Sequence, residues 1–222
     1  MKKDIKKNRI KKYFIDACHQ IISTESVDAV TIRKVADLAG YNSATLYNYF
    51  ENLDHLLFYA SCKHLKGYLL KLKTVELPED CVERYFLIWK HFSEEAFINA
   101  EFYYIMFFKF YNRNFNDTIK DYFDIYPEEL EGLSQSLLPM LVESKLWKRD
   151  FENLKDCAAA GYIRDEDVLI INDMLVLIFE SMIMHASKEE NLDISAHVEK
   201  ILDYIKRIFK AHLIEGAYKL EI

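Results

Sequence analysis

Apolar residues recur every three or four positions along most of this chain, the spacing that places side chains on one face of an α-helix. The first such segment has apolar residues at Ile10, Tyr13, Phe14, Ala17, Cys18 and Ile21. Lysine and arginine fill the opposite face, and the pattern breaks at the polar residues 23–26. We therefore predict a helix over residues 5–23.

Two short helical patterns and one long one follow. Thr31 is suited to cap a first short helix, and Gly40 favours its end because glycine adopts left-handed backbone angles without steric cost. After the turn at residues 40–42, Ser43 or Asn42 is suited to cap a second short helix that reaches about Tyr49. A longer helix is expected over residues 52–73.

Beyond Pro78 the chain becomes acidic and aromatic, and the helical spacing continues. It covers residues 79–99, 101–113, 116–124, 127–146, 149–160, 165–187 and 193–214. Pro127 fits a first helical turn, whereas Pro139 should kink or split its helix. With only 5 Gly and 3 Pro, the chain lacks the turn residues of an all-β fold. We predict an all-α fold.

Charge is distributed unevenly. The whole chain has a net charge of −7, but residues 1–73 contain 13 Lys and Arg against 7 Asp and Glu. The rest contains 16 Lys and Arg against 29 Asp and Glu. A polyanion such as DNA would be attracted to the first third and repelled by the remainder.

Several classes of protein are disfavoured. The four cysteines, Cys18, Cys62, Cys81 and Cys157, form no C-x-x-C pair, so we expect reduced thiols, no metal site and no cofactor. The basic start lacks a following apolar segment, and the longest unbroken apolar run, residues 102–108, is too short to span a membrane. No phosphate-binding loop, nucleophile elbow or zinc-protease motif is present, so we expect no enzyme. The prediction is a cytoplasmic protein that does not enter membranes.

The segment 31–50, TIRKVADLAGYNSATLYNYF, fits a helix-turn-helix, in which the first helix braces a second that enters the major groove of DNA. Small residues begin the second helix. Leu46 and Phe50 are four residues apart and share its inward face, which leaves Tyr47, Asn48 and Tyr49 to face outward.

Residues 31–57 resemble the DNA-binding domain of the TetR family of regulators. The matching positions are Thr31, Val35-Ala36, Ala39-Gly40, Thr45-Leu46-Tyr47 and Tyr49-Phe50, followed by a long helix with Leu56-Leu57. Three positions depart from the family pattern. Ala44 replaces a glycine, Tyr41-Asn42 replaces a Val-Ser-like pair, and Leu53 replaces a lysine that contacts a DNA phosphate. The Lys-rich N-terminal arm is a possible substitute for that lysine.

The resemblance implies roles for individual residues. Thr31, Tyr47 and Tyr49 match positions that contact phosphates, and Ser43, Ala44, Thr45 and Asn48 match positions that face bases or backbone. Asn48 is the best candidate to recognise adenine, because an amide pairs with the adenine edge through two hydrogen bonds. Arg33 faces either the backbone or solvent. Thr31 as a plain helix cap, Tyr47 as part of the core and the N-terminal lysines as a solvated face remain the structural alternatives.

The aromatic run at residues 102–111, FYYIMFFKFY, is denser than one packed helix face requires. Together with earlier aromatic residues it is predicted to line an effector pocket, with plain core packing as the alternative. The candidates are Trp89, Phe92, Phe102, Tyr103, Met106, Phe107, Phe110 and Tyr111. The surplus of carboxylates suggests a cationic ligand, although surface charge explains it more simply.

The last two helical segments carry apolar stripes that suit a dimer interface, and in the TetR family the last two helices of each subunit form one. The candidates are Ile171, Leu175, Ile178, Met182, Val198, Ile201, Leu202 and Ile205. The alternative is the core of a monomer.

We therefore predict a helix-turn-helix domain over residues 1–51 and a helical ligand-binding and dimerisation domain over residues 52–222, with helix 52–73 connecting them. The predicted function is a homodimeric regulator of transcription, most simply a repressor that an unknown small-molecule effector releases from a palindromic operator in double-stranded DNA. An activator is equally compatible with the sequence. The competing hypothesis is a helical adaptor that uses its basic arm on membranes or acidic partners.

Overall fold

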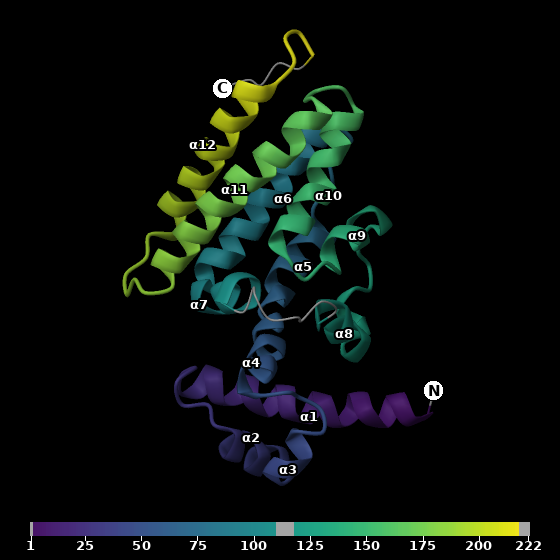
Figure 1. Ribbon diagram of the computed structural model, residues 1–222, viewed down its shortest axis with the longest axis vertical. Helices are drawn as coiled ribbons and strands as arrows, with labels where there is room; N and C mark the ends of the chain where they lie inside the picture. Colours follow the sequence, from purple (N-terminus) through teal and green to yellow (C-terminus); the bar gives the residue numbers. More distant parts are fainter. Residues whose placement is uncertain (1, 110–117, 218–222) are drawn as a thin grey trace.

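The computed structural model describes residues 2–109 and 118–217, and these residues are mostly helical (Figure 1). The α-helices are α1 (Lys2–Thr24), α2 (Ile32–Ala39), α3 (Ser43–Leu46), α4 (Leu53–Cys62), α5 (Leu65–Thr74), α6 (Cys81–Ile98), α7 (Ala100–Tyr104), α8 (Thr118–Ile125), α9 (Leu138–Leu141), α10 (Leu146–Ala159), α11 (Asp165–Ala186) and α12 (Ile194–His212). Among the described residues the only β-type pairing is a single bridge between Ile163 and Leu213. The predicted all-α fold is confirmed.

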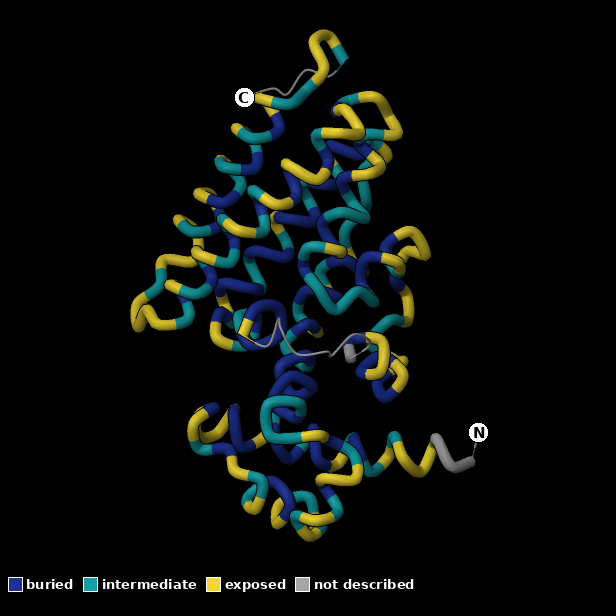
Figure 2. Tube along the Cα trace, viewed as in Figure 1, coloured by how far each residue is buried: buried dark blue, intermediate teal, exposed yellow. Residues whose placement is uncertain are grey.

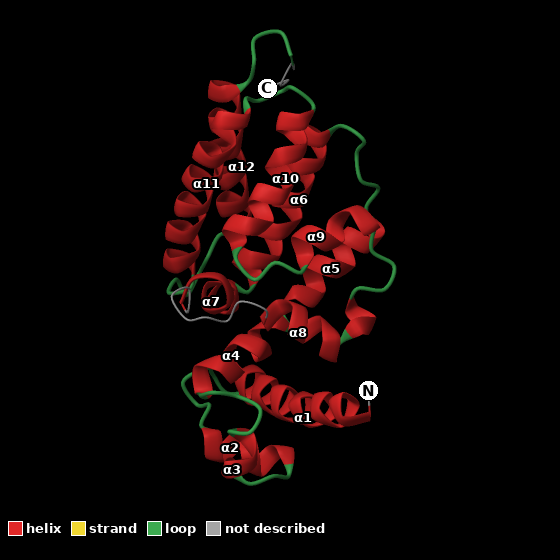
Figure 3. Cartoon of the chain, turned by 45° about the vertical axis from the view of Figure 1, so that its right-hand side comes forward, coloured by secondary structure: helices red, strands yellow, loops and turns green. Residues whose placement is uncertain are grey.

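The first three helices form a small bundle at one end of the molecule, and α4 leads from it into the larger C-terminal body (Figures 1 and 3). The bundle has its own apolar centre, because Phe14, Leu46 and Phe50 are almost completely buried. Helix α4 packs against α1 as well as against elements of the C-terminal body. The predicted boundary between residues 51 and 52 stays a prediction.

The predicted long helix over residues 52–73 is instead two helices, which corrects the sequence-based expectation. The break lies at Lys63 and His64, between α4 and α5. There the ring of His64 stacks on Phe102, with centroids 3.8 Å apart, and its Nδ1 lies 2.9 Å from Oδ1 of Asn99. These contacts with α7 and the end of α6 come from distant parts of the chain, so local periodicity could not reveal the break.

The expected helix over residues 127–146 is also wrong. This segment contains two 3₁₀ turns, η2 (Pro127–Glu129) and η3 (Gln135–Leu137), followed by the short helix α9. Pro127 opens η2, as its fixed backbone angle favours. Pro139 lies in the first turn of α9 and therefore does not kink a longer helix.

The C-terminal body is built around α6, which packs against α5, α10, α11 and α12. Figure 2 shows the buried residues concentrated on the facing sides of these helices. Helix α11 is long and apolar enough to cross a membrane by length and composition alone. However, it begins with Asp165, Glu166 and Asp167 and packs along α10 and α12, as a helix of a globular domain does.

The aromatic run continues from α7 into a π-helix, η1 (Ile105–Lys109). A π-helix has a wider turn than an α-helix and is often found at functional sites. Ile105, Met106, Phe107 and Phe108 are all buried here. Most of the described part of the run therefore belongs to the core.

Candidate DNA-binding surface and effector cavity

The two short helices have the capping interactions of a helix-turn-helix. The hydroxyl of Thr31 accepts a hydrogen bond from the backbone N–H of Lys34 at 3.2 Å, and α2 ends at Gly40, whose φ is +76°. Asn42, rather than Ser43, caps α3, because its Oδ1 accepts from the backbone N–H of Thr45 at 2.8 Å. Asn42 is the residue before the first helical position of α3, which is where a capping side chain normally stands.

The inner face of this motif is fixed by aromatic packing against α1. Phe14 packs edge-on against Phe50, with ring centroids 6.2 Å apart, and it also contacts Tyr41 at 5.2 Å. Tyr41 is the bulky residue in the turn where the family pattern has a smaller one. Its ring lies against Tyr13 and Phe14 of α1, so the larger side chain is accommodated between the helices.

The outer face presents most of the residues predicted to contact DNA. Thr31, Arg33, Ala44 and Asn48 are exposed, and 57% of Tyr47 is exposed. The remaining three, Ser43, Thr45 and Tyr49, are half-buried. The hydroxyl of Thr45 donates to Oδ1 of Asn42, and the ring of Tyr49 lies near that of Phe14.

At position 53, the TetR family pattern has a lysine, whereas this chain has a leucine in a partly buried position. Leu53 is half-buried at the first position of α4, and Asn52 caps that helix through a 2.9 Å hydrogen bond from the N–H of His55. The side chain of Leu53 has no hydrogen-bond donor, so this position cannot make the phosphate contact expected of a lysine.

The N-terminal lysines do not act as one group. Lys6 and Lys7 are exposed, whereas Lys11 is buried and forms an ion pair with Asp121 of α8 at 3.1 Å. Lys12 pairs with Glu128 of η2 at 3.3 Å. Lys11 and Lys12 thus hold α1 to the C-terminal body, and only the lysines nearer the N-terminus remain candidates for binding DNA.

Two aspartates anchor this contact between the N-terminal bundle and the C-terminal body. Asp121 accepts a hydrogen bond from the hydroxyl of Tyr59 on α4 at 3.1 Å in addition to its ion pair with Lys11. Asp16 of α1 accepts from the hydroxyl of Tyr126 at 2.9 Å and pairs with Lys63 at the end of α4. We call Asp16, Asp121 and their partners the α1–α8 latch.

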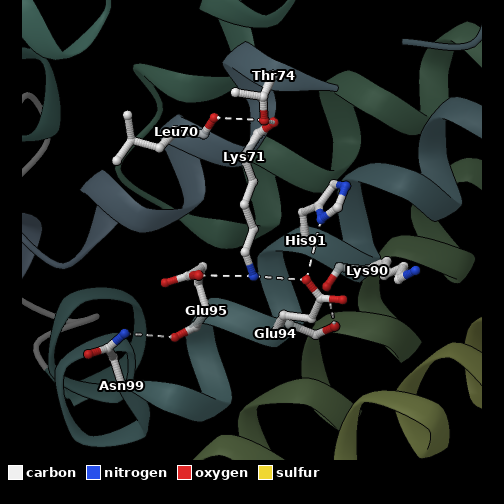
Figure 4. Close-up of polar contacts among 9 residues, drawn as sticks. Leu70, Lys71, Thr74, Lys90, His91, Glu94, Glu95 and Asn99 are labelled. Carbon is white, nitrogen blue, oxygen red and sulfur yellow. Dashed lines mark hydrogen bonds and ion pairs between the residues drawn. The ribbon is translucent and has the colours of Figure 1, made fainter. Parts of the chain in front are cut away.

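A second polar network joins α5 to α6 (Figure 4). Lys71 reaches Glu94 at 2.8 Å and Glu95 at 2.9 Å, and Asn99 donates to the backbone carbonyl of Glu95. Gly67 permits the close approach, because a Cβ at this position would lie 2.2 Å from Oε2 of Glu95. Helix α5 therefore cannot shift along α6 without disrupting charged contacts.

His64, at the junction of α4 and α5, is connected to this network through Asn99. Burial lowers the pKa of His64 to about 4, so the ring is neutral near pH 7. A neutral ring can stack on Phe102 without the cost of burying a charge.

A small cavity of about 20 Å³, with room for about one water molecule, lies among α5, α6, α9 and α10. It is lined by Tyr68, Ile88, Trp89, Phe92, Met140, Leu146, Arg149, Asp150 and Asn153. Trp89 and Phe92 belong to the predicted pocket, and the other lining residues were not predicted. The lining is mostly apolar with a few polar groups, as is usual for small-molecule sites.

The other predicted pocket residues have different surroundings. Phe102 stacks on His64, while Tyr103, Met106 and Phe107 are buried. The ring of Phe107 lies 5.1 Å from the guanidinium carbon of Arg149 and lines a separate surface groove beside Trp147. Phe110 and Tyr111 lie outside the described residues.

Arg149 and Asp150 are the cavity residues that the sequence analysis missed. The stretch containing them reads as the polar surface of a helix, yet both side chains are only 2% exposed. Their spacing could have shown that they are buried, because Leu146, Leu154 and Cys157 fall on the same helical face and are also buried.

Asp150 is held by two donors. Its Oδ1 accepts hydrogen bonds from the hydroxyl of Tyr85 at 2.7 Å and from Nε1 of Trp89 at 2.8 Å. Burial raises the pKa of Asp150 to about 7, although these two hydrogen bonds oppose the shift. The carboxyl group therefore keeps its proton to a much higher pH than an ordinary aspartate does.

The predicted dimer residues divide into two groups. Five are buried within the single chain and cannot contribute to a partner surface, which corrects their assignment: Ile171, Leu175, Val198, Ile201 and Ile205. Ile178, Met182 and Leu202 are half-buried and remain candidates. The stripes chosen from the sequence mark the inward faces of α11 and α12, because periodicity identifies an apolar face without saying what covers it.

The cysteines are free and buried in the structure. Burial raises the pKa of Cys62 well above its ordinary value, so its reactive thiolate is disfavoured. Within residues 2–109 and 118–217, no group of three or more His, Cys, Asp or Glu side chains is arranged to hold a metal ion.

Comparison with known proteins supports the helix-turn-helix directly. Residues 14–60 match the family model described as bacterial regulatory proteins, tetR family. This range includes the second half of α1, the whole helix-turn-helix and most of α4. No curated protein matches the sequence.

Solved structures resemble the whole chain. FadR of Thermus thermophilus, a TetR family transcriptional repressor in complex with lauroyl-CoA, has a TM-score of 0.59 at 16% identity, covering 96% of this chain and 97% of its own. RolR in complex with resorcinol has a TM-score of 0.56 at 14% identity, covering 92% and 93%.

SmeT, the repressor of the Stenotrophomonas maltophilia multidrug efflux pump SmeDEF, has a TM-score of 0.52 at 14% identity, covering 96% and 94%. At such identities the structural likeness establishes the fold, and the matched N-terminal domain adds the family. Residues 14–60 therefore form an N-terminal domain of the TetR family of bacterial regulatory proteins, within a chain whose fold is that of solved TetR-family regulators.

Proposed function

We propose that this protein is a homodimeric, ligand-released repressor that binds a palindromic operator through α3. The observation that carries the proposal is that the helix-turn-helix has a buried inner side and an exposed polar outer side. Leu46 and Phe50 fix its inner side, while Tyr47 and Asn48 stand free on its outer side. Such a helix can enter a major groove without rearranging its own core.

Each candidate has a distinct role in the proposed complex. Asn48 pairs with the edge of an adenine, and Tyr47 and Thr31 donate hydroxyl hydrogens to phosphates. Arg33 is 90% exposed and paired only weakly with Asp37 at 3.9 Å, so it is free to contact the DNA backbone. Lys6 and Lys7 supply the phosphate contact that Leu53 cannot make.

Dimerisation uses the outward face of α11 in this proposal. Ile170 is 51% exposed and Leu177 is 65% exposed, and the half-buried Met174 lies between them. Only a third of the most apolar 18-residue window of α11 is buried in the single chain. A second copy related by two-fold symmetry would cover this surface and place two recognition helices at adjacent turns of DNA.

The α5–α6 network and the α1–α8 latch provide a route between effector and DNA. Tyr68 of the cavity lies on α5, which begins directly after α4, and Lys63 at the end of α4 belongs to the latch. A ligand that shifts α5 against α6 would move α4 and with it the recognition helix. A coupling free energy of about 3 kcal/mol would lower operator affinity roughly 150-fold.

The solved relatives support a small-molecule effector in general terms, because FadR was crystallised with lauroyl-CoA and RolR with resorcinol. The ion pairs of Lys11 and Lys12 with the C-terminal body weigh against the adaptor hypothesis, which needs these lysines on a free basic arm. Cytoplasmic location follows from the proposed access to chromosomal DNA, and the proposed function involves no catalysis.

Operator binding is the decisive test. The purified protein should bind a site in the DNA flanking its own gene, and log affinity should fall with log salt concentration by about 0.9 per neutralised phosphate. Asn48→Ala should weaken binding by about 10-fold or more, since one bidentate base contact contributes about 1–3 kcal/mol. Asn191→Ala, an exposed asparagine between α11 and α12, is the matched control.

Binding that is weak and independent of sequence, with equal effects of both asparagine variants, would contradict the DNA-binding proposal. It would leave a helical adaptor as the better hypothesis.

The dimer surface can be tested by sedimentation. Leu177→Glu places a charge on the proposed interface and should shift the protein to a monomer at micromolar concentration. Leu70→Glu, at a leucine of α5 that is 50% exposed, should leave the oligomeric state unchanged. If Leu177→Glu sediments like the unmodified protein, this face of α11 is not the interface.

A further inference from the structure

A basic groove lies where the N-terminal bundle meets the C-terminal body. Its volume is about 490 Å³, inside the range of about 300–1,000 Å³ found for small-molecule sites. The small cavity beside Arg149 has room for about one water molecule and therefore offers no space to an effector. The groove is lined mainly by residues of α1, of α5 with the turn before it, and of η2, and we call it the α1–α5 groove.

Four lysines of the described chain line this groove. Lys12 and Lys63 already have carboxylate partners, whereas Lys66 and Lys73 of α5 form no ion pair with any described residue. The two α5 lysines lie about two helical turns, or about 10 Å, apart along the helix axis. Their flexible four-carbon stems allow both ammonium groups to approach the same anion.

The carboxylates of η2 reduce the positive charge without cancelling it. Glu128 is already paired with Lys12 at 3.3 Å. Glu129 accepts a hydrogen bond from the hydroxyl of Tyr122 at 2.9 Å. Burial raises the pKa of Glu129, so its charged form is less favoured than in an exposed glutamate. The groove therefore keeps a surplus of positive charge on the two α5 lysines.

Apolar surface lies beside these charges. Leu69 and Leu70 fall between the two α5 lysines in the sequence, and Leu70 is 50% exposed. The ring of Tyr126 also lines the groove, with Nζ of Lys12 at 4.6 Å and Nζ of Lys63 at 4.7 Å from its centroid. A ligand that matches both kinds of surface has an anionic head and an apolar body.

Operator DNA would not reach this groove. Helix α1 lies between the recognition helix α3 and α5 (Figures 1 and 3). DNA bound by α3 would meet the N-terminal bundle from the side away from α5. The α5 lysines are therefore left to a smaller anion.

We propose that the α1–α5 groove binds an amphiphilic organic anion, with a phosphate or carboxylate head on the two α5 lysines and an apolar body against Leu70 and Tyr126. The inference rests on the proposed function only in treating this molecule as the effector. It opposes the cationic ligand suggested by the acidic composition, since the groove is basic although the C-terminal body as a whole is acidic.

The same groove offers a way for the ligand to act on the helix-turn-helix. Lys63, one of its lining residues, pairs with Asp16 of α1 in the latch, and the hydroxyl of Tyr126 donates to the same carboxylate at 2.9 Å. An anionic head beside Lys63 would compete with Asp16 for the ammonium group. The ligand would therefore weaken the attachment of α1 to the C-terminal body and change the position of the recognition helix.

The test compares probes that share one apolar body and differ in the charge of the head. In titration calorimetry at pH 7 on the full-length protein, hexyl phosphate and hexanoate should bind more tightly than 1-hexanol, and hexylamine should bind most weakly. Hexyl phosphate should exceed hexanol by about 10-fold or more, because a phosphate monoester carries about −1.5 to −2 charges at this pH. Equal binding of hexyl phosphate and hexanol, or no binding of either anion at millimolar concentration, would overturn the proposal.

Two further comparisons define the ligand. Whichever of the two anions binds more tightly identifies the preferred head as a phosphate or a carboxylate. Inorganic phosphate should bind about 10-fold more weakly than hexyl phosphate, because it leaves Leu70 and Tyr126 uncovered. Equal binding of the two phosphates would show a bare anion site and overturn the amphiphilic ligand.

A double substitution then places the head. Lys66→Gln combined with Lys73→Gln removes both unpaired ammonium groups and should weaken the binding of hexyl phosphate by about 10-fold, with little effect on hexanol. The matched control combines Lys90→Gln with Lys188→Gln, two exposed lysines outside the groove, and has the same net charge. Equal affinities of the two double variants for hexyl phosphate would show that the anion binds elsewhere.

Operator binding separates this inference from the proposed function. Binding of hexyl phosphate that depends on the α5 lysines but leaves operator affinity unchanged would remove the effector role and leave the anion site standing. Release of the operator by hexanol or hexylamine, with no binding of the anions, would do the reverse.

Discussion

The helix-turn-helix region and the C-terminal body differ in how their polar side chains are hydrogen-bonded and exposed. In the first, Thr31 and Asn42 cap helices, and Tyr47 and Asn48 face solvent. In the second, buried polar atoms lack hydrogen-bond partners, among them the hydroxyl of Tyr103, Nη1 of Arg149, Oδ2 of Asp150 and the side chain of Asn172. Of the unpartnered buried atoms in the described residues, only Nδ1 of His19 precedes α4.

This difference fits the two roles proposed above for these regions. A surface that reads DNA needs its polar groups outside and its backbone fixed, so complete local hydrogen bonding serves it. A site for a small molecule needs polar groups that the protein itself does not satisfy. Buried groups of this kind are uncommon in folded proteins because each costs stability.

The largest expected effect comes from Asp150. Its folded-state pKa of about 7 lies above the value near 3.8 of an unperturbed aspartate, so the folded protein holds a proton that the unfolded chain has lost. Its contribution is therefore most favourable at low pH and decreases as pH rises towards 7. Between pH 5.5 and 8, the unmodified protein should lose on the order of 2 kcal/mol more stability than Asp150→Asn.

Urea unfolding at several pH values measures this difference. Asparagine retains an Oδ1 for Tyr85 and Trp89 but does not titrate, so it isolates the effect of the charge. Parallel stability curves for the two proteins would mean that Asp150 is ionised throughout and that the cavity is more polar than its lining suggests.

A smaller loss of stability is expected when a polar group that already has its hydrogen bond, the Asn42 cap, is removed. Asn42→Ala removes the cap of α3 and should lower the free energy of unfolding by about 1 kcal/mol, with operator affinity falling as the recognition helix frays. Thermal unfolding and operator titration measure the two effects. Asn42→Ser is the control, since serine is also a good capping residue. Equal losses in both variants would point to a direct contact of Asn42 with DNA.

The smallest effect should have the opposite sign. Tyr103 is completely buried and its hydroxyl has no partner. Tyr103→Phe removes that oxygen and keeps the ring, so stability should stay the same or rise by up to about 1 kcal/mol. A clear loss of stability in unfolding experiments would reveal a hydrogen bond to the hydroxyl and weaken the contrast between the two regions.

The agreement between sequence and structure follows the same division. Thr31, Gly40 and the spacing of Leu46 and Phe50 are local signals, and the helices they predict are present. In the C-terminal body, the break at His64 depends on contacts distant in sequence and was missed, as were the 3₁₀ turns that begin at Pro127. Trp89 and Phe92 line the small cavity, although their predicted contact with an effector stays a prediction, and Arg149 was missed although it shares a helical face with Leu146.

By itself, the sequence determined the helical class, the position of the recognition motif, the cap of its first helix and the opposite charges of the two ends. The helices and the cap depend on residues within one or two helical turns of each other, and the charges depend on composition alone, so periodicity and side-chain chemistry reveal them. Only the tertiary structure decided that Lys11 joins α1 to α8, that Ile171 and Leu175 are core and that Arg149 faces a cavity. The reason is physical: whether a given side chain is buried, paired or exposed depends on which distant helix covers it.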